Sequence, residues 1–449
     1  MAVSTAAPAA DSVALPPPIA DLERPGRFRW IICALLFAAT ALNYVDRQII
    51  GILQPQLAQQ FHWSESDYGN IVFWFQLAYA LGYVVFGKLI DRMGARFGYA
   101  LAVGIWTVAH VAHAWASSLT SFMVARFAIG LGESGNFPSG LKAVAEWFPK
   151  RERALATGIF NAGTNVGAII TPLIVPAITL TLGWRAAFLI TGSFTVFWLI
   201  AWLAIYRSPR EQPRLRATEL ALIESDPADP PESIPWMSLL KVRETWAFAG
   251  AKFLIDPIWW MYLFWLPDFL VKRHHLDLKT FGPPLVAIYV VSDLGSIAGG
   301  WMSSRLLRAG FTLNAARKWT MLLCAVLVIP VFAASYVDSL WAAVAIVALA
   351  AAAHQGFSCN LFTLPSDVFP RRAVGSLVGI GGTAGAIGGM LLAKYAGWVL
   401  DRIGSFAPIF ALAGSAYLLA LLVVHILSPR LAPARVGSLA GADSGRPLL

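Results

Sequence analysis

Residues 42–51 read LNYVDRQIIG, and they close an apolar segment that begins at Trp30. Asp46 and Arg47 place a carboxylate beside a guanidinium in this segment, at a depth where hydrocarbon would surround a membrane-spanning helix. A charge at such a depth costs several kcal/mol, so ionisable residues inside a span mark a candidate transport pathway and require a partner. The stretch therefore predicts a membrane-spanning helix whose charges serve a function.

The partners that we nominate lie in the segment 119–141. Arg126 and Glu133 are seven residues apart there, so they lie on one helical face about two turns from each other. We expect Arg126 at about the depth of Asp46, and Arg47 reaching along its long stem toward the deeper Glu133. The alternative is a salt-bridge network that only fixes helix packing, although hydrophobic side chains could do this without the cost of desolvation.

Composition places the whole chain in the membrane. Of its 449 residues 57% are hydrophobic and 13% are charged, and the mean hydropathy is +0.63. A span needs about 20 mostly apolar residues. The twelve segments that qualify are 30–53, 69–90, 97–116, 119–141, 154–177, 185–206, 245–270, 283–306, 317–336, 340–362, 373–396 and 405–427. We therefore predict an all-α integral membrane protein with twelve transmembrane helices in two six-helix pseudo-symmetric halves.

Charge predicts the orientation. The net charge is +9, and these spans leave most of the 34 Lys and Arg residues on the side of the two termini. The positive-inside rule then makes both termini cytoplasmic, and we expect a multi-pass protein of a bacterial inner membrane. Because no basic domain accompanies the high charge, the composition excludes nucleic-acid binding as its explanation.

A polar, proline-rich stretch divides the chain. We expect a first bundle over 28–206, a cytoplasmic linker over 207–244 and a second bundle over 245–428, with a disordered tail over 1–27 and a cytoplasmic tail over 429–449. Phe148-Pro149 recurs as Phe369-Pro370 with the following glycines at the same spacing, which supports an internal repeat.

Cysteines indicate neither a disulfide framework nor a metal site. Cys33, Cys324 and Cys359 all fall in apolar segments, and their spacing suits small core residues. We therefore expect no metal and no cofactor.

Polar and aromatic side chains inside the spans are candidates for a substrate cavity. Besides Arg47 they are Tyr44, Tyr79, Asn161, Thr164, Asp256, Trp259, Trp260, His354, Gln355, Asn360 and Thr383. Aromatic rings can stack on the apolar face of a sugar while polar groups hold its hydroxyls. The alternatives are an interfacial or packing role for Tyr79, an interfacial aromatic belt for Trp259 and Trp260, and a hydrogen-bonded packing role for His354.

The run 87–96, GKLIDRMGAR, resembles the loop signature between the second and third spans of the major facilitator superfamily. The resemblance implies that Asp91 and Arg92 help to latch a cytoplasmic gate. The alternative is that these charges only follow the positive-inside rule.

Further runs are similar to the anion:cation symporter family within that superfamily. Residues 43–47, Arg126 with Glu133, and 141–149 carry this resemblance, while 253–257 and 354–369 look like bacterial hexuronate transporters, which take up glucuronate and galacturonate. There are departures. Asp46 and Tyr44 fit the galactonate transporter better than the enterobacterial hexuronate transporter, and Thr164 stands where the galactonate transporter carries a glutamine.

These residues suggest a proton-coupled symporter that acts as a monomer. Arginine keeps its proton, so Arg47 is the natural receptor for a substrate carboxylate, which it can bind bidentately. The acid partner displaced from Arg47 would then take up a proton, and Arg126 would steer the protonation of Asp46 and Glu133. The alternatives are a symporter of another organic anion, such as galactonate, glucarate or an aromatic acid, and a solute sensor that does not transport. An enzyme has less support, because we find no metal-ligand spacing, phosphate loop or nucleophile elbow.

Overall fold

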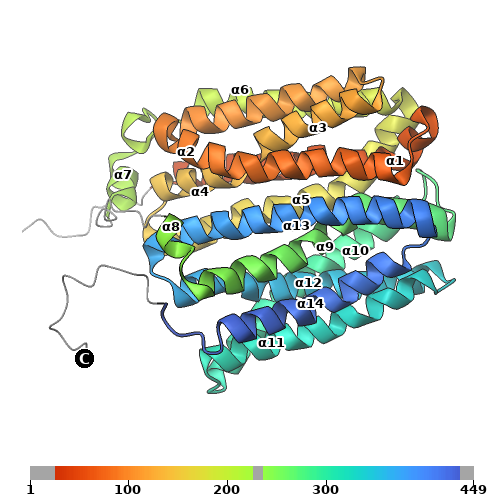
Figure 1. Ribbon diagram of the computed structural model, residues 1–449. Coiled ribbons are helices and arrows are strands. Elements are labelled where there is room, and N and C mark those ends of the chain that lie inside the picture. The colour runs from red at the N-terminus through yellow and green to blue at the C-terminus, as the bar shows by residue number, and fades with distance from the viewer. Residues whose placement is uncertain (1–25, 226–235, 435–449) are drawn as a thin grey trace, which may run out of the picture.

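The computed structural model describes residues 26–225 and 236–434. The side chains of Asp91, Ala154, Trp236, Arg371 and Arg372 also lie outside the described part. Most of the predicted tails, 1–27 and 429–449, and residues 226–235 of the predicted linker fall outside it as well. Within the described ranges the chain forms helices and no strand, as the fold class predicted (Figure 1).

The long helices follow one another in two sets. The first set is α1 (Phe28–Phe61), α2 (Glu65–Ala112), α3 (Leu119–Glu133), α4 (Asn136–Trp147), α5 (Lys150–Leu182) and α6 (Trp184–Ile205). The second set is α9 (Arg243–His274), α10 (Gly282–Arg308), α11 (Leu313–Val328), α12 (Leu340–Val368), α13 (Arg371–Ile403) and α14 (Ala407–Leu427). Between them lie the short helices α7 (Ala217–Ile223) and α8 (Trp236–Leu239). The 3₁₀ helices are η2 (His113–Trp115), η3 (Pro209–Glu211) and the longer η4 (Ile329–Ser335).

Eleven helical segments of the described chain are long and apolar enough to cross a membrane. Two of them, Glu65–Ile90 and Arg92–Trp115, lie along α2 and the following η2. The chain kinks within α2 at Gly94, where φ is 75° and ψ is 168°. That backbone conformation favours glycine, since a Cβ atom would strain it.

The predicted fourth span, 119–141, needs a correction. It is not one continuous helix, because α3 ends at Glu133 and α4 begins at Asn136. At the break the Gly135 amide donates to the Gly132 carbonyl at 3.1 Å, which is the tighter spacing of a 3₁₀ turn. The two short helices together cover the predicted crossing, and the break between them lies directly after the buried carboxylate of Glu133.

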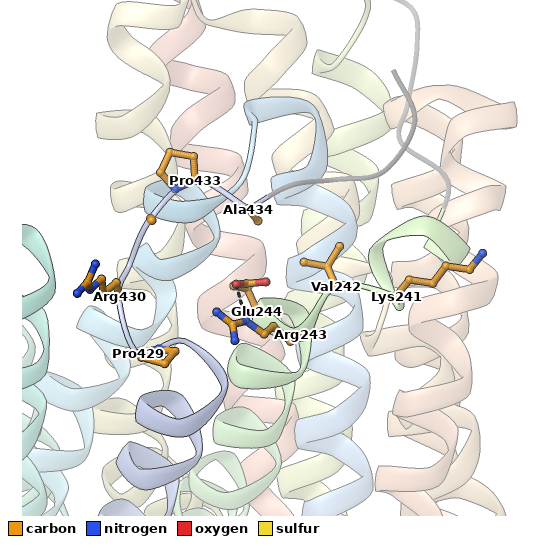
Figure 2. Close-up of a pocket in the computed structure, with 9 residues that line it drawn as sticks. Lys241, Val242, Arg243, Glu244, Pro429, Arg430, Pro433 and Ala434 are labelled. Carbon is orange, nitrogen blue, oxygen red and sulfur yellow. Dashed lines mark hydrogen bonds and ion pairs between the residues drawn. The ribbon is translucent and has the colours of Figure 1, made fainter. Parts of the chain in front are cut away.

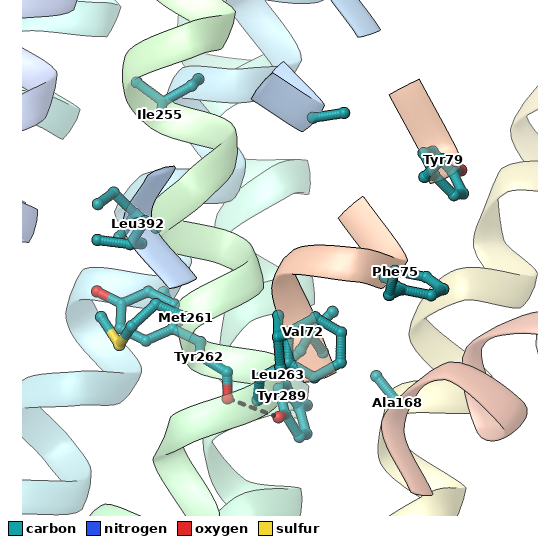
Figure 3. Close-up of a cluster of buried hydrophobic side chains, with 14 of the residues drawn as sticks. Val72, Phe75, Tyr79, Ala168, Ile255, Met261, Tyr262, Leu263, Tyr289 and Leu392 are labelled. Carbon is teal, nitrogen blue, oxygen red and sulfur yellow. Dashed lines mark hydrogen bonds between the residues drawn. The ribbon is translucent and has the colours of Figure 1, made fainter. Parts of the chain in front are cut away.

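The two sets of helices pack against each other over several pairs. Figure 1 shows α1–α6 in the upper part of the molecule and α9–α14 in the lower part. Contacts between the sets join α2 to α13, α5 to α10 and α1 to α9. An apolar cluster between them contains Val72 and Phe75 of α2, Leu263 of α9 and Leu392 of α13, and in it the Tyr289 hydroxyl donates to the Tyr262 carbonyl at 3.3 Å (Figure 3).

The two ends of the bundle differ. One, here named the short-loop end, carries the connections at residues 62–64, 275–281 and 404–406, and the other, the linker end, carries residues 206–242. Ties between the two sets gather at the short-loop end. Asp401 accepts hydrogen bonds from the first amides of α2, and the Tyr68 hydroxyl donates to the Phe264 carbonyl at 2.9 Å.

Candidate functional site

A buried ion pair lies between α1 and α3. Arg47 Nε donates to Glu133 Oε2 at 2.8 Å, and Arg47 Nη2 donates to Asn43 Oδ1 at 3.0 Å. Arg47 is 3% exposed and Glu133 is fully buried. The sequence predicted that these two side chains would meet, and an ion pair this deep has lost its hydration, so breaking it would leave an uncompensated charge.

Aromatic rings enclose the Arg47 guanidinium. Its Cζ atom lies 4.8 Å from the ring centre of Tyr44, 4.9 Å from that of Tyr79, 5.1 Å from that of Trp260 and 5.6 Å from that of Phe75. Each ring face attracts a cation at these distances. Because Trp260 belongs to α9, the cage is built from both sets of helices.

Arg126 reaches the backbone of α1. Its Nη2 donates to the Arg47 carbonyl at 3.1 Å, and its Cζ lies 4.5 Å from the ring centre of Phe75. Within the described residues its Nε and Nη1 have no hydrogen-bond partner, and neither has Glu133 Oε1. Arg126 and Glu133 therefore both face the Arg47 region from α3, as their seven-residue spacing predicted. Each of the two side chains has at least one polar atom that makes no hydrogen bond within the described residues.

Asp46 faces another set of neighbours. Thr195 Oγ1 of α6 donates to its Oδ2 at 3.0 Å, and His110 Nε2 of α2 lies 3.3 Å from its Oδ1. Consecutive helical residues point about 100° apart, which separates Asp46 from Arg47. Among the described residues Asp46 forms no ion pair with an arginine. Sequence reasoning missed His110, although a histidine inside the apolar segment 97–116 was a signal that could have found it.

The second set of helices carries a second charge pair. Lys252 Nζ and Asp256 Oδ2 are 2.6 Å apart on α9, one turn from each other, as the sequence predicted. Their side chains are 7% and 15% exposed. Because α9 is packed against α1, α12, α13 and α14, this exposure is directed into the bundle rather than toward lipid.

Two aromatic contacts hold His354 in place. Its ring stacks on Trp259 with centres 5.3 Å apart and planes 6° apart, and its Nδ1 lies 2.7 Å from the Tyr417 hydroxyl. Trp259 is itself partly exposed and lies beside Tyr44, and Tyr44 is within electrostatic reach of Asp256. The predicted residues Tyr44, Asp256, Trp259 and His354 therefore lie in one region between α1, α9 and α12.

Four other predicted cavity residues are placed less centrally. Asn161 is exposed on α5, and Thr164 is buried and donates to the Asn161 carbonyl at 2.8 Å. Gln355 is partly buried on α12, and Thr383 of α13 donates to a carbonyl of its own helix. In the described part of the chain, none of these four hydrogen-bonds to Arg47 or is one of the rings around it.

Asn360 holds helices together. Its Nδ2 donates to the Gly356 carbonyl of α12 at 2.9 Å and to the Gly299 carbonyl of α10 at 3.2 Å. Arg317 donates to its Oδ1 at 3.4 Å, so both the nitrogen and the oxygen of the Asn360 amide have hydrogen-bond partners. In this conformation Asn360 is a packing residue, although the sequence suggested a substrate contact.

The predicted gate residues lie at the linker end. The side chain of Asp91 is outside the described part, and Arg92 is exposed. Their predicted gating role stays a prediction.

A surface recess also lies at the linker end, between the start of α9 and residues 429–434 (Figure 2). Lys241, Arg243, Glu244 and Arg430 line it, and Arg243 pairs with Glu244 at 3.1 Å. None of the predicted site residues lines this recess.

No cluster that could hold a metal ion occurs in the described part of the chain. Cys33, Cys324 and Cys359 carry free thiols there, the first two of them buried.

Comparisons with known proteins agree with this arrangement. The family described as Major Facilitator Superfamily matches residues 36–393. The chain is 33% identical over 402 residues to the hexuronate transporter of Escherichia coli (strain K12), a match that covers 88% of this chain and 93% of that protein. It is 32% identical over 308 residues to the galacturonate transporter of Dickeya chrysanthemi, covering 67% of this chain and 89% of that one.

A third relative and a solved structure complete the comparison. The D-galactonate transporter of Escherichia coli O6:H1 is 27% identical over 403 residues, covering 86% of this chain and 93% of that one. A bacterial homologue of the human lysosomal transporter Spinster, solved in an inward-facing and occupied conformation, superposes with a TM-score of 0.68 at 18% identity, covering 90% of this chain and 96% of that one. That likeness confirms the predicted fold.

Proposed function

The chain belongs to the major facilitator superfamily and is a transport protein rather than an enzyme, and from this premise we propose that it imports a sugar-acid anion together with protons. The substrate class that we propose is a hexuronate such as glucuronate or galacturonate. The names of the relatives in Escherichia coli and Dickeya chrysanthemi support this class. The observation that carries the proposal is the buried Arg47–Glu133 pair inside its aromatic cage.

Arg47 is the proposed carboxylate receptor. A guanidinium can bind a carboxylate with two parallel hydrogen bonds, and Arg47 already makes one such bond to Glu133. A substrate carboxylate would compete with Glu133 for the same donors. The rings of Tyr44, Tyr79 and Trp260 would then cover the apolar face of the sugar while the guanidinium holds its charge.

The second set of helices supplies the proposed contacts to hydroxyl groups. The Lys252–Asp256 pair offers donors and acceptors, and His354 is fixed in orientation by Trp259 and Tyr417. A neutral sugar would leave Arg47 without an anion, whereas a uronate satisfies both ends of this site. The geometry therefore favours a polar substrate with one carboxylate.

Competition for Arg47 couples substrate to protons in this proposal. When the substrate carboxylate takes the place of Glu133, the glutamate loses its counter-charge in a buried position, and a proton is the neutralising ligand. Substrate and proton then enter the same reorienting state. Arg126, with two donor atoms unpaired in this conformation, is the group that would respond to the change on Glu133.

Topology is part of the proposal. We place the linker end and both termini in the cytoplasm of a bacterial cell, with the protein in the inner membrane and active as a monomer. The sequence charge supports this orientation. The gathering of ties at the short-loop end then corresponds to a conformation closed toward the outside.

Uptake by reconstituted vesicles tests both parts. With an imposed inward proton gradient, vesicles should accumulate labelled glucuronate or galacturonate, and galactonate, glucarate and an aromatic acid form the competing panel. Strong uptake of another panel member alone would replace the hexuronate by that anion and leave the transport mechanism standing.

Glu133→Gln separates transport from coupling. The amide keeps the size and a hydrogen-bond acceptor for Arg47 but cannot take up a proton, so exchange of labelled for unlabelled substrate should continue while gradient-driven accumulation is lost. Glu211→Gln, an exposed change in η3, is the matched control and should keep both activities. Full accumulation by the Glu133 variant would refute the coupling role.

A further inference from the structure

Gln76 is a buried glutamine whose amide has no hydrogen-bond partner. It belongs to α2 and is fully buried, and within the described residues neither its Nε2 nor its Oε1 makes a hydrogen bond. An amide group offers two donor hydrogens and an acceptor oxygen, and burying them unpaired lowers the stability of the fold. A leucine of similar size would avoid this loss, so the amide at this position needs an explanation.

The Gln76 amide lies where the two sets of helices meet. α2 packs against α13, and a Cβ atom at Gly389 of α13 would lie 2.9 Å from Gln76 Nε2 and 3.2 Å from its Oε1. The missing side chain of Gly389 therefore leaves the space that the amide occupies. Gln76 contacts the second set of helices in this way without hydrogen bonding to it.

On α2, Gln76 is next to the Arg47 cage. Tyr79 follows it by three residues, so the two side chains share a face about one turn apart, and Phe75 directly precedes it. The rings of Phe75 and Tyr79 both lie beside the Arg47 guanidinium, and Figure 3 shows them on neighbouring turns of α2. Gln76 therefore adjoins the proposed carboxylate receptor.

On α13, the same region borders the second charge pair. Gly385 precedes Gly389 by about one turn, and a Cβ atom at Gly385 would collide with the Asp256 carboxylate, which pairs with Lys252. The Gln76 amide thus lies about one turn from the Arg47 cage along α2, and the glycine that it contacts lies about one turn from this pair along α13.

We propose that Gln76 is a further substrate-binding residue, which recognises two neighbouring hydroxyl groups of the sugar acid. The proposal rests on the proposed function, in which Arg47 binds the substrate carboxylate. Nε2 of Gln76 donates to the oxygen of one hydroxyl group, and Oε1 accepts from the other, so a single amide binds both members of the pair. In this conformation α2 and α13 enclose the amide, and a movement that separates these helices exposes it to the substrate.

This contact selects among anions that Arg47 alone would accept. A carboxylic acid with neighbouring hydroxyl groups satisfies both the guanidinium and the amide, whereas an aromatic acid without hydroxyl groups leaves the amide unpaired. A site that hydrogen-bonds a substrate hydroxyl group discriminates strongly against analogues that lack it, because its own buried polar groups then have no partner. Gln76 thus favours polyhydroxy acids.

Gln76→Leu in the full chain separates a binding role from a packing role. Because leucine removes an unpaired amide at similar volume, the thermal unfolding temperature of the purified protein without added sugar acid should stay the same or rise. Uptake of glucuronate or galacturonate by reconstituted vesicles should show a KM about tenfold higher, since two hydrogen bonds to the substrate are lost. Gln59→Leu, the same substitution at an exposed position of α1, is the control and should change neither quantity.

Deoxy analogues identify the hydroxyl groups. In vesicles with the wild-type protein, glucuronates that lack one hydroxyl group at either of two neighbouring carbons should compete less well than glucuronate. Gln76→Leu should abolish the difference at these two carbons. Removal of a hydroxyl group at another carbon is the internal control and should have the same effect in both proteins.

A second variant keeps the test decisive if Gln76→Leu does not fold. Gly389→Ala places a methyl group 2.9 Å from Gln76 Nε2, so the amide must move while it stays in the protein. This variant should raise the KM and weaken the discrimination against the same two deoxy analogues. Gly375→Ala, on the same helix at an exposed position where the added methyl group meets no atom within 4 Å, should leave the KM unchanged.

The outcomes separate this inference from the proposed function. A lower unfolding temperature of Gln76→Leu with an unchanged KM would show a packing role and overturn the inference, while transport of the hexuronate would still stand. Equal discrimination by the wild-type protein and both variants would also overturn it, as expected if a water molecule satisfies the amide. If the vesicles instead take up galactonate or glucarate, the proposed hexuronate is wrong, and Gln76→Leu should raise the KM for that hydroxylated anion.

Discussion

Asp401 ties the two sets of helices at the short-loop end, and its removal should open that end. Its Oδ1 accepts from the Glu65 amide and its Oδ2 from the Ser66 amide, each at 2.9 Å, so a carboxylate of α13 caps the first turn of α2. Asp401→Ala deletes both bonds and the favourable charge at a helix N-terminus.

The magnitude follows from the value of a cap. A capping side chain contributes about 0.5–2 kcal/mol, and because Asp401 is exposed to solvent we expect about 1 kcal/mol. Ser64 and Asp67 also cap α2, but they belong to the first set of helices and do not depend on closure. The loss therefore falls on the closed conformation alone, and the ratio of open to closed molecules should rise about fivefold.

Spin-label distances measure that ratio. Thr181→Cys and Lys279→Cys place labels at exposed positions of the two sets at this end, in a background where the three native cysteines are replaced. Asp338→Ala is the matched control, because Asp338 is 93% exposed at the same end and pairs with Arg273 within its own set at 2.6 Å. Equal distance distributions for the Asp401 and Asp338 variants would refute the reasoning.

Two more changes probe the central region. Trp260→Leu removes one ring from the Arg47 cage and should raise the KM of uptake about fivefold with little change in maximal rate, since a cation–π contact is worth about 1 kcal/mol. Trp246→Leu, which removes an exposed ring outside the cage, is the control and should leave the KM unchanged. Lys252→Met leaves Asp256 buried without its cation and should lower the thermal unfolding temperature in detergent, and adding Asp256→Leu should restore it without restoring transport. A destabilisation that the double variant retains would contradict the pairing argument.

Spacing and composition predicted much of this molecule. Apolar runs of sufficient length gave the spans, and charges at bilayer depth required partners, which is why the Arg47–Glu133 contact could be expected. The break between α3 and α4 was missed, although the run Ser134-Gly135-Asn136 interrupts the apolar pattern at this point.

Other features depend on packing that spacing does not determine. A helical repeat tells which residues share a face but not which helix that face meets. The depth of Asp46 could therefore be predicted, but its neighbours His110 and Thr195 could not. Asn360 shows the same limit, because a polar side chain in a span can serve a neighbouring carbonyl as well as a substrate.

Charge neutrality explains why a carrier of an anion would keep two acids in separate places. The charges of Arg47, Arg126, Asp46 and Glu133 sum to zero when both acids are ionised. In the proposed cycle a bound monoanion makes this sum negative, and one proton on either acid restores neutrality before the bundle reorients. If both acids shared the arginines, substrate binding would disturb both proton sites at once. With Asp46 held by the Thr195 hydroxyl and Glu133 held by Arg47, the substrate displaces only one of them, so binding of the anion disturbs one proton site and leaves the other in place.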